Sequence, residues 1–175
     1  SSSATITQMY NNILVNKQGT ASTAAFCIMT AATANISGGA INNNDYYANG
    51  NGKIGYYNSA VVATLTAWQT ATGKDALSLN EAPIFTSATD LHIPTNTITL
   101  LESSGAPVAT TGINNDIDGQ TRPGISSYGF GTAPDMGADE FDGRVQYTCT
   151  TPAPGNTLTS ANNLCLGQTV NLSLQ

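Results

Sequence analysis

Short runs of strand-forming residues, separated by Asn and Gly, make up the first third of the chain. Between Thr5 and Gly55 the runs are TITQMYNNILVN, TAAFCIMTAATANISGGAINNNDYY and GKIGYY. MYNNILVN and GAINNNDYY are similar in kind, because each carries Asn where a strand should bend. Short strands between such bends favour a parallel β-helix, in which each coil makes one turn and Asn side chains bond along the stack. The alternative, an antiparallel sandwich, would show clearer polar–apolar alternation and more two-residue hairpin signals.

One amphipathic helix is predicted within residues 63–73, ATLTAWQTATG. Thr64 suits the N-cap position, and Gly73 suits the cap after the last turn. Leu65 and Trp68 are three residues apart and therefore share a face. We expect Trp68, the only tryptophan, to be a core anchor that pins this helix on the sheet.

The segment NEAPIFTSATDLHI, residues 80–93, is predicted to return to extended structure. It places His92, the only histidine, in a strand two residues after Asp90. Because no second His and no free Cys lie nearby, a zinc site is not expected here. We interpret His92 as a structural or exposed residue.

The C-terminal part differs in composition from the rest. Residues 144–159 contain TPAPGNT, which is typical of a linker. Within residues 160–175, apolar and polar positions alternate in LCLGQTVNLSLQ. This pattern predicts one strand whose apolar face carries Val170, Leu172 and Leu174. A lone strand cannot stabilise itself, so we interpret residues 160–175 as the truncated start of a second β domain, a β-sandwich.

Three cysteines give an odd count. Cys27 lies in the apolar run AAFCIM and is interpreted as a buried free thiol. Cys149 and Cys165 form a candidate disulfide across a short loop, or each pairs with a cysteine beyond residue 175. The sequence does not decide between these connectivities.

Residues 114–143 concentrate acidic side chains in a chain that is only 9% charged. Gly and Pro are frequent in the same stretch, which predicts tight turns and excludes a regular helix or central strand. Short acids in turns either accept bonds from backbone amides or hold a cation. Six of the eleven acids lie here: Asp116, Asp118, Asp135, Asp139, Glu140 and Asp142.

The first interpretation of this segment is structural. Arg122 can form a bidentate pair with Asp139 or Glu140 and so tie DIDGQTRP to PDMGADEF. With Asp135, these residues would close the end of the fold, and we assign residues 1–143 to terminal coils and their cap.

The second interpretation is a calcium site. Asp116 and Asp118, one residue apart and followed by Gly119, resemble the start of a calcium loop. The third acid and the distal Glu of an EF-hand are missing, so the match to a calcium loop is incomplete. Ca²⁺ is the one candidate cofactor, and no other is implied.

Charge excludes some partners. Five basic residues against eleven acids give a net charge of −6, which argues against binding nucleic acid or an anionic membrane surface. No apolar run has the length of a membrane span, so membrane insertion is not expected. No signal peptide opens the sequence, and we expect any export signal to have been removed or to lie upstream. Thr, Ser, Asn and Gly dominate the rest, as in an all-β protein with many turns.

The motifs occur in a familiar order: NNNDYY, IGYY, TLTAWQTATGKDALSLNEAPIF, SATDLHI, DIDGQTRP and PDMGADEF. In this order the chain resembles the C-terminal region of right-handed parallel β-helix proteins of the pectate-lyase-like superfamily, common in secreted multidomain proteins of Bacteroidetes-type bacteria. The resemblance covers roughly residues 10 to 142 and is specific in AWQTATGKD and in the paired acidic motifs. The tail resembles the opening of an immunoglobulin-like repeat.

The resemblance implies a secreted or cell-surface protein, often exported by the type IX secretion system, whose β-helix serves as a scaffold or adhesin-like module. Its partners would be glycans or other surface proteins, and the secretion machinery during export. One departure is the stretch TNTITLLESSGAPVATTGI, where many family members carry an SPAI-D/N-AG segment. It matches only in length and in Gly105, so a local difference in that coil is expected.

Catalysis is the competing function. A polysaccharide lyase needs a Lys or Arg base and a cation or Arg for the uronate carboxylate, and a glycosidase needs two facing acids. The five basic residues are scattered singly, and none except Arg122 lies beside a cluster of carboxylates. We therefore predict a non-catalytic module, with a carbohydrate-active β-helix enzyme whose site lies upstream as the alternative.

Overall fold

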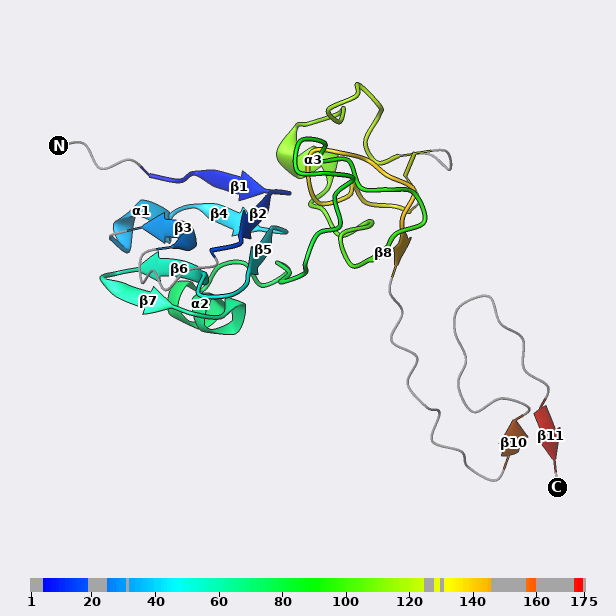
Figure 1. Ribbon diagram of the computed structural model, residues 1–175, viewed down its shortest axis with the longest axis horizontal. Helices are drawn as coiled ribbons and strands as arrows, with labels where there is room; N and C mark the ends of the chain where they lie inside the picture. Colours follow the sequence, from blue (N-terminus) through cyan, green and yellow to red (C-terminus); the bar gives the residue numbers. More distant parts are fainter. Residues whose placement is uncertain are drawn as a thin grey trace. The chain divides into compact units, whose positions relative to one another are not determined.

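The computed structural model describes residues 5–18, 25–30, 32–124, 128–129, 131–145, 157–159 and 172–174 (Figure 1). The chain divides into two compact units, residues 1–145 and residues 146–175. Short strands outnumber helices in the described residues, so the protein is β-rich.

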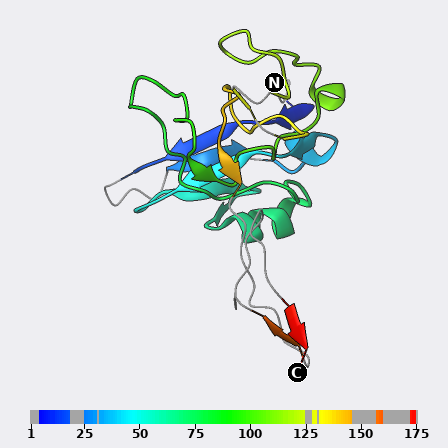
Figure 2. The ribbon, with the colours of Figure 1, turned by 90° about the vertical axis from the view of Figure 1, so that its right-hand side faces the viewer.

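Three parallel strand pairs build the N-terminal half of the first unit (Figure 1, Figure 2). Gln8 pairs with Ala40 and Ile13 pairs with Asp45, so in the first two pairs the partner lies 32 residues further along the chain. The pairs are β1 (Gln8–Tyr10) with β4 (Ala40–Asn42), β2 (Ile13–Asn16) with β5 (Asp45–Ala48), and β3 (Phe26–Thr30) with β6 (Lys53–Tyr57).

Asparagine bends separate the successive strands. Asn11 follows β1 and Asn43 follows β4, and both have left-handed φ angles, 56° and 52°, which Asn tolerates better than most residues. The next residues stack, because Asn12 Nδ2 donates to Asn44 Oδ1 at 2.9 Å. Asn44 is fully buried, and its amide also donates to the carbonyl oxygen of Met9 at 3.0 Å. Asn side chains therefore bond from one bend to the next, as expected from the sequence.

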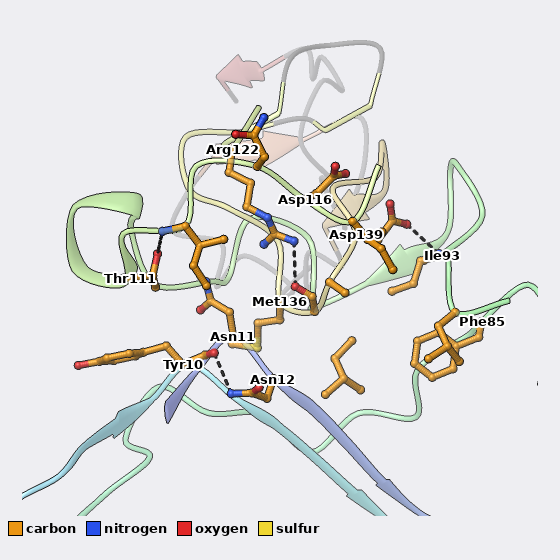
Figure 3. Close-up of a pocket in the computed structure, with 17 residues that line it drawn as sticks. Tyr10, Asn11, Asn12, Phe85, Ile93, Thr111, Asp116, Arg122, Met136 and Asp139 are labelled. Atoms are coloured by element: carbon orange, nitrogen blue, oxygen red, sulfur yellow. Dashed lines mark hydrogen bonds between the residues drawn. The ribbon is translucent and has the colours of Figure 1, made fainter. Parts of the chain in front are cut away.

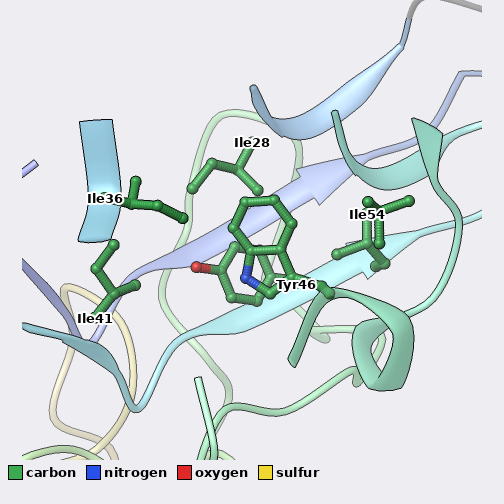
Figure 4. Close-up of a cluster of buried hydrophobic side chains, with 7 residues drawn as sticks. Ile28, Ile36, Ile41, Tyr46 and Ile54 are labelled. Atoms are coloured by element: carbon green, nitrogen blue, oxygen red, sulfur yellow. The ribbon is translucent and has the colours of Figure 1, made fainter. Parts of the chain in front are cut away.

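The predicted helix is α2 (Leu65–Thr72). Thr64 Oγ1 accepts from the Ala67 amide at 3.2 Å, and Gly73 caps the other end with φ 66°. Trp68 has no exposed surface, and a side chain at Gly55 of β6 would meet its ring at 2.6 Å. The helix is thus pinned on the strands through Trp68. The core cluster around it is Ile28, Ile36, Ile41, Tyr46, Ile54, Val62 and Trp68 (Figure 4).

Asp75 is the hydrogen-bond centre beneath α2. Its Oδ2 accepts from Trp68 Nε1 at 2.8 Å and from the Tyr46 hydroxyl at 3.2 Å. Its Oδ1 accepts from the Ser78 hydroxyl at 2.6 Å and from the Asn44 amide at 3.2 Å. The carboxylate is buried, so these four donors take the place of water.

Some local elements were not predicted. β7 (Ala60–Val62) folds back antiparallel on β6. Asn58 and Ser59 connect the two strands with φ angles of 47° and 63°, the left-handed conformation that tight hairpins need. Asn-Ser lacks the usual Gly, so this turn carried no clear hairpin signal. The single-turn helices α1 (Ala34–Ser37) and α3 (Val108–Thr111) were also not expected.

Residues 80–143 fold largely without regular elements. In this region β8 (Ile98–Thr99) pairs in parallel with β9 (Arg144–Val145). A second core cluster, Ile93, Leu101, Met136 and Phe141, lies beneath these loops.

The predicted strand at His92 is wrong, because His92 lies in a loop. Ser87 Oγ accepts from the Asp90 amide at 3.0 Å, and Asp90 Oδ1 accepts from the His92 amide at 3.2 Å. Short polar side chains that bond to nearby backbone in this way favour a turn over a strand.

In the second unit, β10 (Thr157–Thr159) pairs antiparallel with β11 (Leu172–Leu174). β11 lies within the predicted strand, and β10 lies at the end of the segment predicted as a linker. Cys149 and Cys165 lie outside the described residues. Cys27 is a free thiol and is half-buried, so it is less enclosed than predicted.

Asp45 at the start of β5 is a buried carboxylate with an incomplete set of partners. Its Oδ1 accepts from the Glu81 amide at 2.8 Å, while its Oδ2 is buried and has no hydrogen-bond partner among the described residues. Burial raises the pKa of Asp45 to about 7, and the nearby Glu81 charge adds to the effect. The protonated form is therefore favoured in the folded protein.

We expect Asp75→Ala to lower the free energy of unfolding by at least about 3 kcal/mol, because it leaves the buried Trp68 indole and the Tyr46 and Ser78 hydroxyls without their acceptor. Urea unfolding followed by the fluorescence of Trp68 measures this change. Asp142→Ala is the matched control, since Asp142 is half-exposed and its carboxylate bonds to no described residue; it should change stability by less than about 0.5 kcal/mol. A loss below about 1 kcal/mol for Asp75→Ala would contradict the assignment.

Asp45 makes stability depend on pH. Because its folded pKa of about 7 lies above the ordinary 3.8, its contribution is complete below pH 3.8 and is lost as pH rises to about 7. At about 1.4 kcal/mol for each pH unit, the loss is at most about 4 kcal/mol. Asp45→Asn, which stays neutral, should flatten the decline in urea-unfolding free energy between pH 4 and pH 8. An equally steep decline in the variant would show that Asp45 does not titrate in this range.

Candidate functional site

The acidic segment forms a network in which carboxylates accept bonds from backbone amides. Asp116 links its two halves: Oδ1 accepts from the amides of Asp118 at 2.9 Å and Gln120 at 2.7 Å, and Oδ2 accepts from the amide of Glu140 at 3.1 Å. Both Asp116 oxygens are therefore used to hold turns.

Arg122 is paired with Glu140 inside the same network. Arg122 Nη1 lies 3.3 Å from Glu140 Oε1, and both side chains are almost fully buried. Glu140 Oε2 accepts from the Gly124 amide at 2.7 Å, so the pair has a single contact and is not the predicted bidentate one. The guanidinium also donates to the carbonyl oxygens of Asp135 at 3.2 Å and Gly137 at 2.9 Å. Burial raises the pKa of Glu140, although the Arg122 charge acts in the opposite direction.

Asp135 is a buried acid of the same network. Its two oxygens accept from the amides of Ser103 at 2.7 Å and Phe141 at 2.8 Å. Burial raises the pKa of Asp135 to about 8 against the effect of these two bonds, and the charge of Glu102 adds to the rise. Glu102 itself is 1% exposed and accepts from the Gly143 amide at 2.9 Å. Sequence reasoning missed Glu102, because it lies outside the acidic motifs and becomes part of the network only through folding.

His92 contacts two acids on the surface, of which Asp118 belongs to the acidic segment and Asp90 does not. Its Nε2 lies 3.2 Å from Asp118 Oδ2, and its Nδ1 lies 2.5 Å from Asp90 Oδ1. The Asp90 hydrogen bond raises the pKa of His92, and the same bond lowers the pKa of Asp90. Asp139 is buried, accepts from the Ile93 amide at 3.1 Å, and has its pKa raised by burial. It therefore does not pair with Arg122, the alternative that the sequence left open.

The two residues of the predicted calcium site, Asp116 and Asp118, have different surroundings. Asp118 lies with His92 and Asp139 in a group whose candidate ligand atoms are all within 4.8 Å of one another. Asp116 is not part of that group, since its oxygens are bound to backbone amides. The geometry of Asp116 thus supports turn capping.

A cavity of about 440 Å³ lies beside the network, between the Asn11 bend and the loops of the acidic segment (Figure 3). Arg122, Asp116 and Asp139 contribute the charged groups of its wall. Tyr10, Asn11 and Asn12 line the side formed by the bend after β1 (Figure 3). The remaining lining residues are mainly apolar: Ile13, Phe85, Leu91, Ile93, Ile113, Ile117 and Met136.

The charged groups of this cavity are already engaged. Both Asp116 oxygens bind amides, Arg122 is bound to carbonyl oxygens and to Glu140, and Asp139 binds the Ile93 amide. A glycosidase requires one acid free to protonate the leaving group and a second free to act as base or nucleophile. The cavity therefore presents an apolar surface whose polar groups are held by hydrogen bonds, and it does not present the pair of free acids that a glycosidase needs.

A scan against protein-family models, a search of curated proteins and a search of solved structures each found no match to this chain. Among the described residues, no helix has both the length and the apolar character needed to cross a membrane.

We expect Arg122→Met to loosen the acidic segment, because it leaves the buried Glu140 carboxylate without its ion-pair partner and two carbonyl oxygens without the guanidinium donor. Removing one partner of a buried pair typically costs about 3–5 kcal/mol. Hydrogen-exchange mass spectrometry over peptides that cover residues 114–143 should show faster exchange. Lys17→Met is the control for loss of a positive charge, since Lys17 is exposed and forms no ion pair with a described residue. Equal protection of this segment in both variants would contradict the role of Arg122.

Proposed function

We propose that this chain is a non-catalytic structural or adhesin-like module of a large secreted or cell-surface protein. Residues 1–143 act as terminal coils and cap of a right-handed parallel β-helix of the pectate-lyase-like superfamily. Residues 144–159 are a linker, and residues 160–175 are the first strand of an immunoglobulin-like domain. The proposal includes a Bacteroidetes-type protein exported by the type IX secretion system.

The observation that carries the proposal is the regular stacking of the N-terminal strands. Two consecutive parallel pairs have the same separation of 32 residues, and an Asn bend lies between them in each turn. The bond from Asn12 to Asn44 continues along the stacking direction. Parallel strands with one repeat per turn and side-chain ladders at the bends are what a β-helix requires.

The contacts of the acidic network support its role as a cap. The Gly137 amide donates to the carbonyl oxygen of Asn11 at 3.0 Å, and Asn43 Nδ2 donates to the carbonyl oxygen of Ser104 at 3.0 Å. The loops around Ser104 and Gly137 thus satisfy polar groups at two successive bends. An end of a stack needs such cover, because exposed backbone groups would otherwise pair with another chain.

Composition supports the proposed location and partners. A chain with 9% charged residues and a net charge of −6 has few basic side chains for nucleic acid. The resemblance to β-helix surface proteins implies glycans or other surface proteins as the proposed ligands, with the secretion machinery as a transient partner. We propose Cys149 and Cys165 as a disulfide of the C-terminal part, which an oxidising environment would permit.

The second candidate function is part of a polysaccharide lyase or another carbohydrate-active enzyme. The cavity with Arg122 and Asp139 in its wall is the feature that favours it. Because the charged groups of the cavity are engaged with backbone, the active site of such an enzyme would lie upstream of these residues.

An activity assay distinguishes the two functions. The chain and the complete protein that contains it are incubated separately with a panel of anionic polysaccharides, and unsaturated products are measured. We expect no product from residues 1–175. Product from the complete protein alone would favour the enzyme alternative with an upstream site. Product from residues 1–175 that disappears in Asp139→Asn would contradict the proposed structural role.

A further inference from the structure

Three side chains from separate loops converge beside the cavity. His92 comes from the loop before Ile93, Asp118 from the turn held by Asp116, and Asp139 from the loop before Glu140. Their candidate ligand atoms, one imidazole nitrogen and two carboxylate oxygens, all lie within 4.8 Å of one another. We propose that His92, Asp118 and Asp139 bind one divalent transition-metal ion of the Zn²⁺ type, with Asp90 as the residue that positions His92.

The distances are compatible with a metal centre. Zinc bonds to nitrogen and oxygen are about 2.0–2.2 Å, so two ligands of one ion lie up to about 4 Å apart. His92 and Asp118 are 43% and 48% exposed, which leaves their side chains room to close the remaining gap. Asp139 is the fixed ligand, because it is buried and one of its oxygens is held by the Ile93 amide.

Asp90 orients the imidazole for this role. The contact of 2.5 Å between Asp90 Oδ1 and His92 Nδ1 places the ring proton on Nδ1 and leaves Nε2 toward Asp118. A carboxylate that binds the second ring nitrogen is the usual support of a metal-bound histidine.

The local charge lacks a basic counterpart. Arg122 is paired with Glu140, and no ion pair among the described residues joins a Lys or Arg to Asp118 or Asp139. Among the described residues, His92 is the basic group that lies against these carboxylates, and a divalent cation would neutralise them.

The donor set selects the kind of metal. Ca²⁺ and Mg²⁺ prefer oxygen ligands only, whereas an imidazole with carboxylates suits Zn²⁺ and its neighbours. Sequence reasoning excluded zinc because it searched for a second His or Cys near His92. The structure supplies two carboxylates instead, from positions 26 and 47 residues further along the chain. The bound ion would clamp three loops of the cap together, next to the wall that Asp139 shares with the cavity.

The sole histidine allows a site-specific test. Chelator-treated protein without a polyhistidine tag is titrated with Zn²⁺ and Ca²⁺, by calorimetry and by the imidazole ring signals in NMR spectra. We expect one Zn²⁺ per chain, a bound-state set of His92 ring signals, and a higher Tm with Zn²⁺. The calorimetry is repeated in a variant with the substitutions Cys27→Ser, Cys149→Ser and Cys165→Ser, so that thiols do not contribute to Zn²⁺ binding.

Variants separate the ligands from the rest of the acidic segment. His92→Ala and Asp139→Asn should abolish the Zn²⁺ heat, and Asp90→Asn should weaken binding about 10-fold or more. Asp142→Asn, in the same acidic segment but outside the cluster, should bind as the unmodified chain does. Because His92 is exposed, His92→Ala should fold normally, and circular dichroism checks this. Unshifted His92 ring signals, Zn²⁺ binding that survives His92→Ala, or equal affinity for Ca²⁺ would each overturn the proposal.

Discussion

The need of buried backbone amides for hydrogen-bond acceptors shapes this protein more than any other constraint. Residues 80–143 have little regular structure, so their amides cannot rely on helix or sheet partners. Asp116, Asp135 and Glu140 each accept two or more of them. In a chain that is 9% charged, most acids of the segment 114–143 are used in this way, and the loops that they hold line the cavity.

The strand half of the unit solves the same problem differently. Parallel ladders satisfy the backbone there, and the buried Asp75 serves side chains instead of amides, joining Trp68 of α2 to Tyr46 of β5. Both solutions place carboxylates in low dielectric, and the raised pKa values of Asp45 and Asp135 reflect it. The hydrogen bonds to these carboxylates stabilise the fold, but the contributions of Asp45 and Asp135 depend on pH because burial raises their pKa values. Asp90 and Asp118, beside His92, lie on the surface and are accessible to a cation.

Contacts of the site between residues close in sequence were predictable, and contacts between residues far apart in sequence were not. The pairing of Arg122 with an acid of PDMGADEF was predictable, because the motifs are close in sequence and rich in turn residues. The proximity of His92 to Asp118 and Asp139 was not, since two separate loops, 26 and 47 residues further along the chain, supply these acids. The structural roles of Glu102 and Asp75 were also not predicted, because nothing in the sequence distinguishes either residue from an exposed acid. Both become buried only when the chain folds.

The sequence by itself determined the local structure: the bends at Asn11 and Asn43, the helix between Thr64 and Gly73, and the turns of the acidic segment. These follow from backbone preferences of Asn, Gly and Pro and from a short-range cap, which need no distant partner. Only the tertiary structure decided which acids are buried, which amides they bind and where His92 lies, because burial and charge pairing depend on residues far apart along the chain.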